Sequence, residues 1–230
     1  MKILAIEASS EQGSVALLVD GAILSRRIDG AANHSESVLR DIAALLSEAG
    51  LTVGQLDAVA FGAGPGAFTG LRLACGVAQG LALGAGLGVA TVGSLDALAL
   101  QASAPRVFVA TDARMGEVYH AAYVRDEDGT PRPVSAPRCD APENVELLEG
   151  HWTAIGSAFA VWPDALRHRL AMFIDDCRDD LVARADEVAV LGARMALSSR
   201  LLPPEQAAPL YVRDKVALTT AERLARGGRA

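Results

Sequence analysis

Cysteine is scarce in this sequence, and no cysteine belongs to a C-x-x-C pair. The three that occur are Cys75, Cys139 and Cys177. Such spacing contains no local zinc motif and is typical of proteins from a reducing compartment. The N-terminus also lacks the apolar core of a signal peptide, because the run Ile3 to Ile6 is short and leads directly to Glu7. We therefore expect a cytosolic, cytoplasmic protein without a structural zinc ion.

An excess of positive charge is absent as well. The 230-residue chain has 21 Lys and Arg against 28 Asp and Glu, which gives a formal net charge of −7. A protein that binds nucleic acid by itself is expected to present a basic face to the phosphates. The composition disfavours that class. Because 51% of the residues are hydrophobic, a sizeable core is expected in one large or two small domains.

Charge is missing altogether between Arg72 and Asp96. Glycine recurs every four residues within this stretch, at Gly76, Gly80 and Gly84. We reject a membrane span, because a helix that ends by Gly86 is too short for about 30 Å of hydrocarbon. A helix that is apolar on nearly every side is expected to be buried on nearly every side. Either the core encloses this helix or a partner covers it.

A glycine-rich turn, residues 62–70, connects a short apolar strand to this helix. Its sequence is GAGPGAFTG. Thr69 is a natural N-cap, which would leave free backbone N–H groups at the start of the helix. Such a helix end binds anions. However, the turn has neither the Lys-Ser or Lys-Thr of a P-loop nor the G-x-G-x-x-G spacing, so a phosphate loop and a tight connection both remain open.

The hydrophobic periodicity predicts an α/β protein with two similar units. In residues 1–103 it predicts the order βββαβαβα, with strands at 2–7, 14–19, 22–28, 58–61 and 88–93 and helices at 36–49, 71–85 and 94–102. In residues 104–230 it predicts strands at 106–111, 117–125, 152–155 and near 172–174, and helices at 157–169 and 185–199. Ser94 and Ser157 are expected to cap their helices. The second series suggests a duplication of the first.

Four separated segments resemble the signature segments of the TsaB (YeaZ) family. They are KILAIEASSEQGSVALLV after Met1, GPGAFTGLR from Gly64, DARMGEVY from Asp112 and PLYVRDKV from Pro209. The resemblance implies the two-lobed fold of actin, sugar kinases and Hsp70 (the ASKHA fold), with residues 1–103 and 104–230 as its lobes. It also implies a role in making threonylcarbamoyladenosine at position 37 of tRNAs that read ANN codons. In that pathway the TsaB-like subunit is a catalytically inactive paralogue of the TsaD transferase, which it binds and activates together with the ATPase TsaE. It would reach tRNA only through this complex.

The family binds TsaD through its first two long helices, which correspond here to residues 36–49 and 70–85. Carried over to this chain, the interface consists of Val38, Leu39, Ile42, Leu45, Leu46, Leu73, Gly76, Val77, Gly80 and Leu81. Leu45→Glu or Val77→Glu is then expected to abolish partner binding and to leave the fold intact. The alternative is that these residues pack only on their own sheet. When the chain is alone, two alternatives stay open: a homodimer through the same helices or a monomer.

A weak nucleotide-binding or phosphotransfer enzyme of the ASKHA type is the second hypothesis. The candidate nucleotide-binding residues are Glu7, Ser9, Gly64, Gly66, Thr69 and Asp112. Glu7 stands where many ATP-using relatives of this fold carry Asp, and a carboxylate there can hold Mg²⁺ through water.

The catalytic signatures of other enzyme classes are absent. The histidines, at His34, His120, His151 and His168, include no H-x-x-x-H pair of the TsaD type, and no G-x-S-x-G elbow occurs. We therefore expect no metal, no catalysis and no cofactor of the chain's own, with any ATP or ADP bound by the assembled complex.

Overall fold

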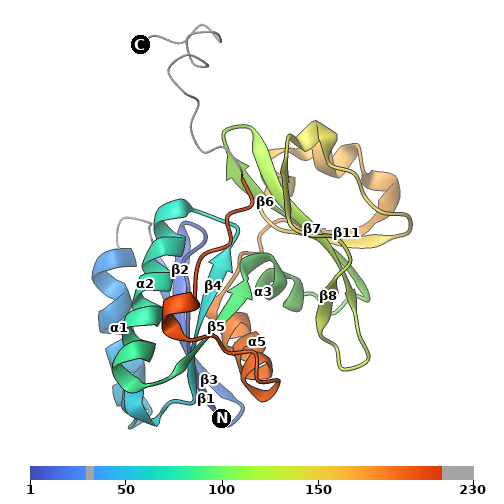
Figure 1. Ribbon diagram of the computed structural model, residues 1–230. Helices are drawn as coiled ribbons and strands as arrows, with labels where there is room; N and C mark the ends of the chain where they lie inside the picture. The colour runs from blue at the N-terminus through green and yellow to red at the C-terminus, as the bar shows by residue number, and fades with distance from the viewer. Residues whose placement is uncertain (30–33, 214–230) are drawn as a thin grey trace, which may run out of the picture.

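The first half of the chain forms an α/β lobe around a five-stranded sheet (Figure 1). The computed structural model describes residues 1–29 and 34–213. The strands are β1 (Lys2–Glu7), β2 (Gln12–Val19), β3 (Ala22–Asp29), β4 (Ala58–Gly64) and β5 (Gly88–Gly93), in the order β3-β2-β1-β4-β5. Strands β1 to β3 form an antiparallel meander, whereas β4 is parallel to both β1 and β5.

A second lobe repeats this arrangement. Its strands are β6 (Arg106–Arg114), β7 (Glu117–Arg125), β8 (Pro131–Pro133), β10 (Trp152–Ile155) and β11 (Ile174–Arg178), in the order β8-β7-β6-β10-β11. Strands β6 to β8 are antiparallel, and β10 is parallel to both β6 and β11. A further strand, β9 (Arg138–Asp140), pairs with β7. The shared order and strand directions confirm the predicted two-lobed α/β fold of the actin, sugar kinase and Hsp70 type.

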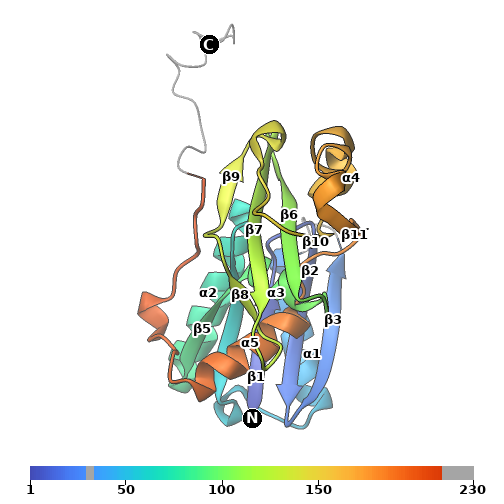
Figure 2. The same ribbon diagram turned by 90° about the vertical axis from the view of Figure 1, so that its right-hand side faces the viewer.

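The helices cover both faces of the first sheet. Helices α1 (His34–Glu48) and α2 (Phe68–Ala85) pack on one face and α5 (Ala185–Leu197) on the other, although α5 follows the second lobe in the chain. Gly192 lets α5 approach closely, because a Cβ atom there would lie 2.7 Å from the Cβ of Ala60. Helix α3 (Ser94–Leu100) lies at the junction of the lobes, and the short helix α4 (Ala158–Val161) belongs to the second lobe (Figure 2).

Two predicted helix caps, Thr69 and Ser94, are wrong, and a third, Ser157, has the predicted position without a capping hydrogen bond from its side chain. Helix α2 begins at Phe68 after Ala67, whose N–H donates to Ser9 O at 2.7 Å, so Thr69 is not the N-cap. Ser94 is the first residue of α3 rather than its cap. Ser157 is the N-cap residue of α4, but its Oγ makes no capping hydrogen bond and instead accepts one from Asp112 N at 3.1 Å.

The second lobe also departs from the predicted elements. The helix expected over 157–169 is instead the short α4 followed by a π-helical segment, Pro163–His168. Pro163 lacks the N–H that a continuous α-helix would need. The strand expected near 172–174 begins only at Ile174, after a 3-10 turn over Ala171–Phe173. Strands β8 and β9 were not predicted, and the last residues of the PLYVRDKV segment lie outside the described residues.

Candidate functional site

Helix α2 buries only one of its faces within the described structure. The prediction that α2 is too short to span a membrane is not supported, because α2, alone among the described helices, is long and apolar enough by length and composition; one such helix is weak evidence, since a core helix passes the same test. Its buried residues, which pack toward the first lobe, are Gly70, Leu71, Ala74, Cys75, Ala78 and Ala82. The opposite face is open, and Leu83 there is 72% exposed. We expect either the core or a partner to cover this helix. The core covers only one of its faces, and the other face is left for a partner.

The open face of α2 forms a groove with the exposed side of α1. The groove has a volume of about 450 Å³ and is lined by Leu39, Arg72, Leu73, Gly76, Val77, Gly80 and Leu81. A Cβ atom added to Gly76 or Gly80 would meet no described atom within 4 Å. Since glycine costs roughly 1 kcal/mol relative to alanine inside a helix, packing among the described residues gives no reason for these glycines. They keep the groove open.

Four of the α1 residues predicted to contact a partner are buried instead. Val38, Ile42, Leu45 and Leu46 are at most 7% exposed and pack in the core between α1 and the first sheet. An amphipathic helix beside a sheet turns its apolar stripe inward, which is why these side chains face the strands. For these four residues the alternative, packing on their own sheet, is correct. Leu39, 55% exposed, stays on the groove.

The glycine-rich turn packs tightly against the turn between β1 and β2. A Cβ atom on Gly66 would lie 2.4 Å from the Cβ of Ser9, and one on Gly70 would lie 1.8 Å from Ala8 O. Gly64 has φ +110°, a conformation that favours glycine. These contacts fit the interpretation of the turn as a tight connection, because any side chain at Gly66 or Gly70 would displace the neighbouring turn.

Glu7 lies beneath this turn and is 1% exposed. Its Oε1 accepts a hydrogen bond from Ser9 N at 2.6 Å, and its Oε2 accepts one from Ser94 Oγ at 3.0 Å. Ser94 Oγ in turn accepts from Gly64 N at 3.2 Å. Burial raises the pKa of Glu7, and the hydrogen bonds from Ser9 and Ser94 oppose that shift. Glu7 thus ties the glycine-rich turn to the start of α3.

Replacing Glu7 by glutamine is expected to change how stability depends on pH. Because the pKa of Glu7 is higher in the folded chain than the ordinary value of about 4.3, the folded state binds this proton more tightly than the unfolded state. Stability from this group is therefore present at low pH and is lost as pH rises through the folded pKa. Urea unfolding of both forms between pH 4 and pH 8 should show that the free energy of unfolding of Glu7→Gln increases relative to that of the wild type as pH rises. If the free energies of unfolding of the two forms differed by the same amount at every pH, the raised pKa of Glu7 would be contradicted.

A cleft of about 570 Å³ separates the two lobes. Of the predicted nucleotide-binding residues, Ser9, Gly66 and Asp112 line it, whereas Glu7, Gly64 and Thr69 do not. Much of the remaining wall is apolar, with contributions from Leu71, Leu95, Leu98, Tyr119, Val161 and Leu210. The fold therefore brings together half of this predicted set.

Carboxylates accompany both arginines that line the cleft. Arg114 pairs with Glu11, and its Nη1 lies 3.4 Å from Asp112 Oδ2. The Nε of Arg213 lies 2.7 Å from Glu117 Oε2. The described walls therefore present little net positive charge to a phosphate. Sequence reasoning gave Arg213 no role, although it belongs to the quoted PLYVRDKV segment.

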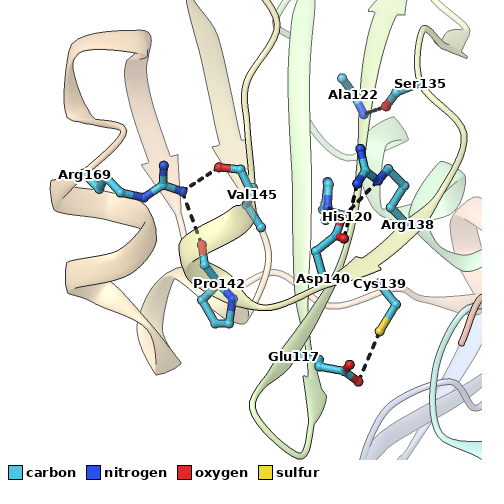
Figure 3. A network of polar contacts seen from close by, with 10 residues as sticks. All are labelled: Glu117, His120, Ala122, Ser135, Arg138, Cys139, Asp140, Pro142, Val145 and Arg169. Atoms are coloured by element: carbon cyan, nitrogen blue, oxygen red, sulfur yellow. Dashed lines mark hydrogen bonds and ion pairs between the residues drawn. The ribbon is translucent and has the colours of Figure 1, made fainter. Parts of the chain in front are cut away.

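Three of the four histidines, His120, His151 and His168, each contact a different aspartate. His120 Nε2 contacts Asp140 Oδ2 at 2.8 Å in the second lobe (Figure 3), and burial lowers the pKa of this imidazole. His151 pairs with Asp175, and His168 pairs with Asp164. Among the described residues, no group of three or more His, Cys, Asp or Glu could hold a metal ion.

Comparison with known proteins places this architecture in a family. Residues 29–218 match the family model of TsaD, tRNA N6-adenosine threonylcarbamoyltransferase. The chain is 35% identical over 225 residues to the tRNA threonylcarbamoyladenosine biosynthesis protein TsaB of Escherichia coli, covering 94% of this chain and 96% of that protein. It is 42% identical over 131 residues to the TsaB of Haemophilus influenzae, covering 55% and 56% of the two chains.

A solved structure agrees with these matches. The structure of YeaZ from Pseudomonas aeruginosa superposes with a TM-score of 0.84 at 34% identity, covering 91% of this chain and 99% of that chain. The match to the Escherichia coli protein and this structural match span both lobes, since they cover 94% and 91% of this chain, and they agree with the four signature segments. The chain belongs to the TsaB (YeaZ) family of tRNA threonylcarbamoyladenosine biosynthesis proteins, which is related to the transferase TsaD.

Proposed function

We propose that this chain is the non-catalytic companion subunit of a TsaD-like transferase. It would be required, together with a TsaE-like ATPase, for threonylcarbamoylation of adenosine 37 in tRNAs that read ANN codons. The observation that carries the proposal is the open groove on α1 and α2, with its two glycines and apolar walls.

The groove suits a partner that presents a similar pair of helices. Because the chain matches the TsaD family model, a TsaD-like protein is expected to have an equivalent helix pair. Two related pairs can pack face to face, as in a two-fold interface, with Gly76 and Gly80 allowing close approach of the helices. Each large apolar side chain buried there contributes roughly 1.5 to 3 kcal/mol before the cost of association. Two copies of this chain would use the same groove when the partner is absent.

The other features of the chain favour a supporting role over a catalytic one. His120, His151 and His168 are each paired with a different aspartate, and the arginines of the cleft are matched by carboxylates. The net charge of −7 is unsuited to holding tRNA without help. We therefore assign tRNA binding, and any binding of ATP or ADP, to the assembled complex.

The decisive experiment measures modification of an A-decoding tRNA by purified TsaD-like and TsaE-like proteins of the same organism. Threonylcarbamoyl-adenylate and ATP are supplied, and this chain is included or omitted. We expect product only when the chain is present, and no product from the chain alone. Full modification without the chain would overturn the proposal, and turnover by the chain alone would overturn its non-catalytic part.

A weak nucleotide-binding or phosphotransfer enzyme is the second candidate. The observation that favours it is the meeting of Ser9, Gly66 and Asp112 on the cleft between the lobes. Calorimetric titration of the isolated chain with ATP and Mg²⁺ tests it, with Asp112→Ala as the matched variant. Saturable binding that Asp112→Ala weakens would support this candidate. If no binding is detected, the companion role is the one candidate function that remains.

A further inference from the structure

A segment after α5 crosses from the first lobe to the second, and we call residues 207–213 the strap (Figure 1). Its first residues are attached to the first lobe. Ala207 O accepts a hydrogen bond from Gln79 Nε2 of α2 at 2.9 Å, and Leu210 N donates to Ala63 O of β4 at 2.7 Å. The strap therefore starts on the helix that forms the groove.

The other end of the strap is attached to the turn between β6 and β7 in the second lobe. Arg213 Nη2 donates to Ala113 O at 2.8 Å and to Arg114 O at 3.2 Å. Its Nε lies 2.7 Å from Glu117 Oε2, and its side chain is only 14% exposed. One arginine thus makes three polar contacts that fix the strap to the second lobe.

Arg72 connects the middle of the strap to the groove. Its Nε donates to Tyr211 Oη at 3.1 Å, and its Cζ lies 3.8 Å above the ring of Phe68. The rings of Phe68 and Tyr211 are 5.6 Å apart. Arg72 also lines the groove beside Leu73 and Gly76. A molecule that enters the groove therefore meets a side chain that is bonded to the strap.

We infer that partner binding in the groove and attachment of the strap to the second lobe are coupled through Arg72 and Tyr211. A partner that packs on the groove restricts Arg72 to its position on Phe68 and Tyr211, which favours the attached strap. The turn between β6 and β7 then becomes less mobile, although it is in the other lobe. Such coupling is reciprocal, so loosening the strap must weaken partner binding by the same factor. The inference rests on the proposed function, because it needs a partner in the groove.

Hydrogen exchange of the amides at residues 112–118, with and without the TsaD-like partner, tests this coupling. In the wild-type chain we expect the partner to slow this exchange. Arg213→Ala should remove the slowing and weaken partner binding about fivefold or more, the lower end of typical coupling between sites. Tyr211→Phe, which keeps the ring and loses only the acceptor for Arg72, should have a smaller effect of the same sign. Arg200→Ala, at an exposed arginine outside the strap, is the matched control and should behave as wild type.

The outcomes separate this inference from the proposed function. If the wild-type chain does not bind the partner, both fail. If Gly80→Arg blocks binding but Arg213→Ala, still folded by circular dichroism, binds within twofold of wild type, the groove stands and the coupling is wrong. Unchanged exchange at residues 112–118 on partner binding would equally overturn the coupling.

Discussion

Gly80→Arg is expected to abolish assembly with the TsaD-like partner while the isolated chain stays folded. Gly80 is exposed on α2, and a Cβ atom there would meet no described atom within 4 Å. Arginine also has a better helix propensity than glycine, by roughly 0.8 kcal/mol, so the free energy of unfolding should not fall. In the groove, however, a long charged side chain occupies the space a partner helix needs. We expect partner affinity to fall at least about 30-fold, as for central interface residues.

Gly54→Arg is the matched control for this variant. Gly54 is also exposed and open around its Cβ position, but it lies in the 3-10 turn Val53–Gln55, outside the groove lining. Co-purification and calorimetric titration with the TsaD-like protein should give wild-type affinity for Gly54→Arg. A Gly80→Arg chain that still assembles with wild-type affinity would place the interface elsewhere.

Leu45→Glu is expected to unfold the chain rather than only to block assembly. Leu45 is 1% exposed in the core between α1 and the first sheet. Truncating a buried leucine alone costs about 2 to 5 kcal/mol, and an unpaired carboxylate in the same place costs several more. That sum approaches the whole stability of a typical domain, roughly 5 to 15 kcal/mol. Circular dichroism and urea unfolding should show loss of cooperative structure.

Val77→Glu is the comparison for Leu45→Glu. Val77 lines the groove and is half-buried, so a glutamate there can reach solvent. We expect this variant to keep its circular dichroism spectrum and to lose the partner. If Leu45→Glu instead unfolded with the wild-type midpoint, the burial of the inner face of α1 would be in doubt.

Several elements could be predicted from the sequence because their signals are local. The strands Lys2–Glu7, Gly88–Gly93 and Trp152–Ile155 have the predicted bounds, since short apolar runs between polar or glycine residues specify them. The end of α2 also follows from sequence, because Gly86 adopts the left-handed conformation that ends a helix. The uncharged stretch with glycine every four residues indicates a helix whose apolar surface must be buried by the core or by a partner. In the structure, one apolar face of α2 is open and lines the groove.

The tertiary structure decided which polar side chains form hydrogen bonds between distant elements, and which apolar side chains are buried or exposed. Thr69, Ser94 and Ser157 all look like helix caps in the sequence, but Ser94 and Ser157 donate or accept across elements distant in the chain. The periodicity of α1 identified an apolar face without showing whether it meets a sheet or a partner. That choice depends on where the sheet lies, and the sheet buries Leu45 while Leu39 stays exposed.

The sequence by itself determined the family, the strand and helix order of the first lobe, and the apolar character of α2, because each of these follows from local pattern or from short signature segments. Only the tertiary structure decided that Glu7 is buried beneath the glycine-rich turn, that half of the predicted nucleotide-binding residues reach the cleft, and that the strap ends on the second lobe. The physical reason is that burial, pKa and contacts across the lobes depend on residues far apart in the chain, which no local pattern brings together.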